Sequence, residues 1–143
     1  MVPAPVGRAM SWTGEELGLR AVVHVAATEV ARGDFVPATV SVLAAAGSSS
    51  RRVTWGEPVT GGIRPSGEAE PRGWFLGRIA GVGRWATLDP DHPLAISALV
   101  GTTPIVPGLP LPPGEYEVVV RLLLDLGPED VRIEVVGPEI RLA

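Results

Sequence analysis

Residues 111–126 read Leu-Pro-Pro-Gly-Glu-Tyr-Glu-Val-Val-Val-Arg-Leu-Leu-Leu-Asp-Leu, which is a turn followed by an apolar run with a period of two. That period is typical of a β-strand with one buried face. The inward set is Tyr116, Val118, Val120, Leu122, Leu124 and Leu126. Tyr116 is also the only tyrosine of the chain. The stretch therefore predicts a long strand that begins at a proline–glycine turn and contributes to the core.

The turn ahead of this strand carries a structural motif. Leu111, Pro113, Gly114 and Tyr116 form Leu-x-Pro-Gly-x-Tyr, which resembles the tyrosine corner of Greek-key β-sandwiches. There the ring packs into the core and the hydroxyl donates a hydrogen bond to backbone a few residues upstream. A second stretch, residues 28–36, resembles the turn that opens the second strand of bacterial immunoglobulin-like domains. Similar pairs occur in the intracellular proteinase-inhibitor sandwich, so the resemblance implies a fold rather than a function.

Further strands are expected wherever apolar residues alternate between turn-forming residues. Such segments lie at 17–28, 35–46, 51–55, 94–100 and 131–142, with one or two more strands within 74–88. Gly137-Pro138 predicts a β-bulge in the last of them. Helical periodicity does not persist beyond a turn or two. We expect an all-β chain, an immunoglobulin-like Greek-key β-sandwich of about seven to eight antiparallel strands.

The chain is expected to form one domain. Residues 1–16 are a Pro-rich N-terminal lead, and residues 17–143 form a single β-sandwich domain with a long irregular segment at 56–73, which is rich in Gly, Pro and Glu. The N-terminus has no apolar targeting region, and no apolar run reaches the roughly 20 residues of a membrane-spanning helix. We therefore expect a soluble, cytoplasmic protein without membrane insertion.

Composition narrows the classes of function. The chain has 143 residues, a formal net charge of −4 and no cysteine, which disfavours nucleic-acid binding by phosphate neutralisation and excludes disulfides. All 12 basic residues are Arg, and Lys, Asn and Gln do not occur. A high-GC bacterial genome explains these absences together, and heat adaptation is the alternative.

Residues suited to catalysis are scarce. The two histidines are His24, on the outward face of the 17–28 segment, and His92, in the turn that contains Asp89 and Asp91. The turn residues could hold a cation, or could simply build the turn through side-chain bonds. We expect no enzyme, no cofactor and no metal, and we do not expect a small-molecule ligand.

A candidate partner surface comes from apolar and aromatic residues in places that should be polar. Val119 and Leu123 flank Arg121 on the back of the 115–126 strand, where a solvated sheet face would be polar at nearly every second position. Trp12 and Trp85 stand in less regular segments near Gly or Arg. Each side chain is either exposed and available to bind a partner, or buried where it fills the sandwich. We expect part of this face to be covered either by the chain's own residues 56–73 or by another subunit. Val119, Arg121, Leu123, Trp12 and Trp85 together predict a surface that binds a protein partner or a second copy of the chain.

Three functions follow from this reading. The first is a non-catalytic protein-binding or assembly module, with a sheet face and loops as its interaction surface. The second is an intracellular proteinase inhibitor that presents residues 56–73 to a protease. The third is a carbohydrate-binding module that uses exposed tryptophans.

Overall fold

The computed structural model describes residues 8–11 and 18–143, with side chains from residue 18 onward. Within these residues the protein is all-β and contains no helix, hence none that could span a membrane. The strands are β1 (Arg8–Ser11), β2 (Leu19–Val25), β3 (Glu29–Val30), β4 (Phe35–Ala44), β5 (Arg51–Glu57), β6 (Val59–Arg64), β7 (Gly73–Trp74), β8 (Val82–Leu88), β9 (Leu94–Gly101), β10 (Thr103–Pro104), β11 (Gly114–Asp125) and β12 (Asp130–Leu142).

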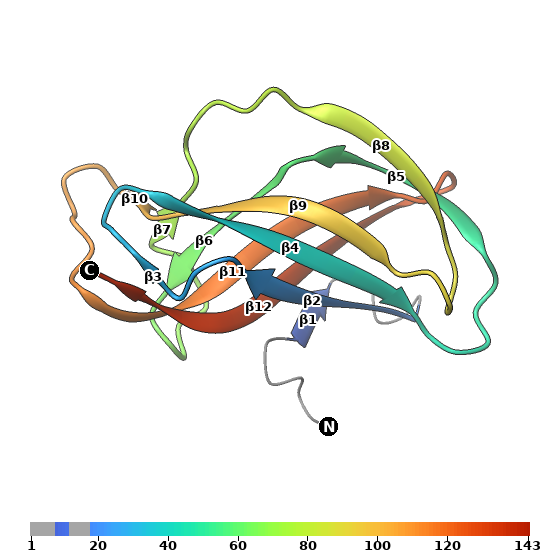
Figure 1. Cartoon of the computed structure of the whole chain (residues 1–143), viewed down its shortest axis with the longest axis horizontal. Coiled ribbons are helices and arrows are strands. Elements are labelled where there is room, and N and C mark those ends of the chain that lie inside the picture. Colours follow the sequence, from blue (N-terminus) through green and yellow to red (C-terminus); the bar gives the residue numbers. More distant parts are fainter. Residues whose placement is uncertain (1–7, 12–17) are drawn as a thin grey trace.

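These strands form one continuous hydrogen-bonded sheet. Its main path runs β1-β12-β11-β6-β9-β4-β2, and the antiparallel pair of β5 and β8 branches from β11 (Figure 1). The sheet curls, so that β2 at one end packs against β12 near the other. Gly137 permits this approach, because a Cβ atom there would lie 2.2 Å from Val23 Cγ1. Most pairs are antiparallel, as expected, but β6–β9 and β3–β12 are parallel.

The inner surface of the curled sheet holds the core. The apolar residues at every second position of β2, β4 and β11 are buried or half-buried there, as a period of two requires. They pack against inward residues of β9 and β12, among them Ile96, Val131 and Ile133. Opposite Val118, residues Gly137 and Pro138 take the place of a single partner residue, so the register shifts at the predicted bulge.

The corner motif is confirmed. Tyr116 and Leu111 are buried, and the Tyr116 hydroxyl donates a 2.6 Å hydrogen bond to the carbonyl of Pro112. Burial raises the pKa of this hydroxyl above its ordinary value of 10.0. Gly114 has a φ of 146°, a conformation that side chains disfavour, which explains the glycine at the first residue of β11. The corner thus fixes where the longest inward-facing run begins.

The expectation of an irregular segment at 56–73 was wrong for half of its length. β6 lies inside it and pairs with both β11 and β9 near the middle of the sheet. Gly61 and Gly62 are buried in β6, and their neighbours leave no room for a side chain at either position. A Cβ at Gly61 would lie 2.5 Å from the Val119 carbonyl oxygen, and one at Gly62 would lie 1.8 Å from that of Gly73. These glycines mark close packing rather than a loop.

The expected lead at 1–16 also contains a strand. β1 pairs with β12, and its residues Arg8 and Ser11 stand opposite Val136 and Ile133. The described residues form twelve strands rather than the expected seven to eight, and eight of these, including the unexpected β6, have six or more residues. β1, β3, β7 and β10 are shorter additions that sequence periodicity did not indicate.

Candidate functional site: a groove between β5, β8 and β11

Three of the five predicted surface residues meet at one groove. Arg121, Leu123 and Trp85 all line it, although Trp85 comes from β8 and the other two from β11. Leu123 is 50% exposed and Trp85 is 61% exposed. Val119, in contrast, is fully buried, so its assignment to an exposed surface was wrong. Trp12 lies outside the described residues.

The groove forms where β5 separates from β11. The two strands pair at a single position, Asp125 opposite Thr54. Away from that position β5 pairs only with β8, and β11 pairs with β6 instead. The resulting space has a volume of about 710 Å³, which is within the range of ligand and peptide sites. Its lining is Thr54, Trp55, Gly56, Pro58, Val59, Thr60, Ile79, Gly83, Arg84, Trp85, Arg121, Leu122, Leu123 and Asp125.

Two tryptophans shape the groove and differ in exposure. Trp55 is half-buried, packs against the core and donates its indole N–H to Glu57 Oε1 at 2.8 Å. Trp85 has most of its ring in solvent, and the guanidinium of Arg52 lies 4.2 Å from its ring centroid. A cation over an indole face fixes the ring orientation. On one side of the groove, Trp55 is held by the core and by Glu57. On the other side, Trp85 is exposed to solvent and its ring is held in place by Arg52.

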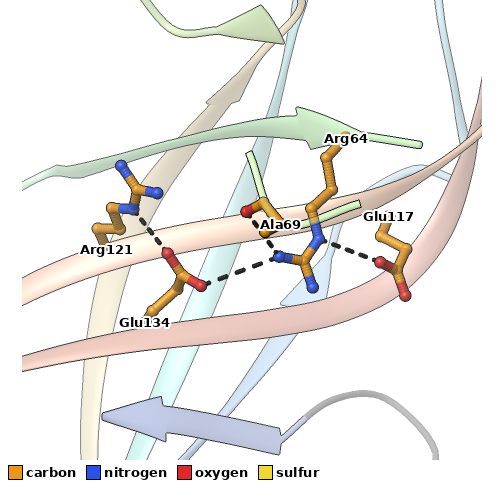
Figure 2. A network of polar contacts seen from close by, with 5 residues as sticks. All are labelled: Arg64, Ala69, Glu117, Arg121 and Glu134. Carbon is orange, nitrogen blue, oxygen red and sulfur yellow. Dashed lines mark hydrogen bonds and ion pairs between the residues drawn. The ribbon is translucent and has the colours of Figure 1, made fainter. Parts of the chain in front are cut away.

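A network of ion pairs lies beside the groove on the outer face of the sheet (Figure 2). Arg64, 7% exposed, donates from Nε to Glu117 at 3.1 Å and from Nη1 to the Ala69 carbonyl at 3.1 Å. Its Nη1 is also 3.9 Å from Glu134, which in turn accepts a 2.8 Å bond from Arg121. Two positive and two negative charges therefore balance at a poorly solvated place.

This network explains the burial of Val119. The register places Val119 opposite Gly62 of β6 and Val136 of β12, between the Arg64–Glu117 pair and Arg121. Trp74 lies across Gly62, since a Cβ there would be 2.6 Å from the Trp74 ring. Covering residues from β6 and β7 thus enclose Val119. β6 begins at Val59, so its pairing with β11 extends only as far as Arg121. Leu123 lies outside that pairing, which leaves the leucine exposed.

The arginine–tryptophan contacts join residues far apart in the chain. Arg72 and Arg84 are near Trp74 and Trp85 in sequence, but they do not make these contacts. Instead Arg52 stacks on Trp85, and Arg121 lies 5.4 Å from the Trp74 ring centroid. Both contacts follow from strand pairing, because β5 brings Arg52 beside β8 and β6 brings β7 beside β11.

The turn between β8 and β9 is built by its own side chains. His92 Nδ1 lies 2.9 and 3.0 Å from the two carboxylate oxygens of Asp89, and the Asp91 N–H donates to Asp89 at 2.9 Å. The hydrogen bond from His92 lowers the pKa of Asp89, and the bond to Asp89, aided by its charge, raises the pKa of His92. Across residues 18–143, no group of three or more His, Cys, Asp and Glu residues is arranged to hold a metal ion.

Replacement of Asp89 by Asn is expected to lower the pKa of His92, because it removes the carboxylate that favours the charged imidazole. The pair stabilises the fold below the ordinary His pKa of 6.5, and this contribution is lost as the pH rises through the higher pKa of the folded state. NMR titration of His92 in wild-type and D89N protein measures the change. Equal pKa values in the two proteins would contradict the contact.

The segment that an inhibitor would present is largely held in place. Residues 59–64 are strand β6, and Arg64 binds the Ala69 carbonyl. Glu68 pairs with Arg72 at 3.0 Å, and the Arg72 N–H donates to the Ile63 carbonyl at 2.9 Å. Within 56–73, nine residues (58 and 65–72) lie outside strands, and Arg72 and Ala69 among them are hydrogen-bonded to residues of β6.

Comparisons with known proteins do not place the chain in a family. No family model matches it, and no curated protein has a matching sequence. Two chains of solved structure are similar to it, one of which is the sporulation control protein Spo0M from Bacillus subtilis. That likeness has a TM-score of 0.43 and 18% sequence identity, and it covers 87% of this chain and 49% of that one. The chain thus spans about half the length of that protein.

Proposed function

We propose that this chain is a non-catalytic protein-binding module whose contact surface is the groove between β5, β8 and β11. The observation that carries the proposal is the convergence of Trp85, Leu123 and Ile79, all well exposed, on one concave site. Large apolar side chains around a pocket are typical of the residues that contribute most to protein–protein affinity. The rigid strands that hold them reduce the entropy lost on binding.

The immunoglobulin-like relationship belongs to the same proposal. Its support is the Tyr116–Pro112 hydrogen bond and the buried alternating faces of β4 and β11. Carbohydrate binding has less support, because Arg52 occupies one face of the Trp85 ring and leaves only the other for a sugar.

Affinity capture with the immobilised chain tests the function. Trp85→Ala and Leu123→Ser should reduce retention of a specific native partner about tenfold or more, because each removes an apolar contact of the groove. The matched control is Leu109→Ser, which changes an equally large leucine that is 62% exposed and not in the groove lining. Equal retention by all variants would contradict the proposal. So would Trp85-dependent binding of glycans in place of proteins.

A further inference from the structure

The groove follows strand edges rather than one face of the sheet. Successive side chains of a strand point to opposite faces, so a groove on one face is lined by alternate residues. Here consecutive residues line it: Thr54, Trp55 and Gly56 from β5, and Leu122 and Leu123 from β11. The lining thus contains both core-side and outer-side residues, as expected for a gap between two strands.

The strands beside this gap lack ladder partners on the sides that face each other. β11 pairs with β6 as far as Arg121 and with β5 only at Asp125, so residues 122–124 have no register partner there among the described strands. Residues 55–57 of β5 pair with β8 on one side only. Unpaired strand edges expose backbone donors and acceptors that favour the addition of another extended chain.

The charges at the gap favour a negatively charged occupant. Its lining contains two arginines, Arg84 and Arg121, and one acid, Asp125, although the whole chain has a net charge of −4. Glu134 pairs with Arg121 at 2.8 Å, whereas Arg84 lies 4.0 Å from Glu57 and its side chain is 58% exposed. Arg84 is therefore the cation best placed to pair with a carboxylate.

We propose that the gap binds an extended acidic segment of a partner protein. Its backbone pairs with the free edge of β11 or β5, an apolar side chain contacts Trp85 and Leu123, and a carboxylate pairs with Arg84. A second copy of the chain is the alternative occupant, and a Trp85-dependent dimer would identify it. This inference rests on the proposed function and specifies the chemistry of its partner.

A displayed library of 12-residue peptides, screened against the full chain, tests the inference. We expect enriched peptides that alternate apolar residues with Asp or Glu. Their affinity should fall about tenfold or more on Arg84→Glu, and should recover when the peptide acid is changed to Arg. The control Arg20→Glu makes the same charge change on an exposed residue of β2, outside the groove, and should have little effect. Methylation of the peptide backbone nitrogens should also abolish binding, since it removes the donors of a strand.

Other outcomes overturn the inference. Enriched peptides with helical spacing, or without acidic residues, would exclude an extended acidic occupant even if they require Trp85. The inference would also be overturned if no enriched peptide required the groove residues for binding. A dimer that depends on Trp85 in light scattering would overturn it as well. In each case the capture experiment with Trp85→Ala still decides the proposed function separately, because it uses whole partner proteins.

Discussion

Replacement of Arg64 by Met is expected to lower the free energy of unfolding by about 3–5 kcal/mol, the usual cost of removing one partner from a buried ion pair. The variant leaves Glu117 without its cation and Glu134 with Arg121 alone. It also releases the Ala69 carbonyl, which loosens the turn after β6. Denaturant unfolding followed by tryptophan fluorescence measures the change.

Arg141→Met is the matched control for this prediction. Arg141 pairs with Glu115 at 3.6 Å, but the two side chains are 64% and 53% exposed. Solvent screens such a pair, so its loss should cost about 1 kcal/mol or less. If Arg64→Met costs no more than Arg141→Met, the network in Figure 2 contributes little and does not hold β6, β11 and β12 together.

Replacement of Gly62 by Ala is expected to cost about 3 kcal/mol or more, at the upper end of the range for overpacking. The added Cβ would lie 1.8 Å from the Gly73 carbonyl oxygen, a backbone atom that cannot move without breaking the β6–β7 pairing. Gly56→Ala is the control, because no atom lies within 4 Å of its Cβ position. It should change stability by less than about 0.5 kcal/mol. Equal unfolding midpoints for the two variants would contradict the close approach of β6 and β7.

The features that sequence could predict are local ones. Alternation from Tyr116 to Leu126 identifies a strand and its inward face because both depend on a period of two. The corner could be recognised because its hydrogen bond joins Tyr116 to Pro112, which is only four residues earlier in the sequence. The bulge at Gly137-Pro138 could also be predicted locally, because both of these residues disfavour regular strand pairing.

The features that were missed depend on distant neighbours. Gly61 and Gly62 resemble a loop until Val119 and Trp74 are seen to occupy the space beside them. Val119 and Leu123 have the same parity on one strand, yet only the first is covered, because β6 begins opposite Arg121. No local pattern encodes where a partner strand starts. Arg121, Leu123 and Trp85 line one groove and their role as a partner surface stays a prediction, whereas Val119 is buried and cannot belong to that surface.

The central claim is that these three residues form one protein-binding site. Calorimetric titration of the captured partner into the wild-type chain, Trp85→Ala and Leu109→Ser tests it most directly. We expect the dissociation constant to rise about tenfold or more for Trp85→Ala, while Leu109→Ser stays within about twofold of wild type. Equal dissociation constants for wild type and Trp85→Ala, with both proteins folded, would contradict the claim.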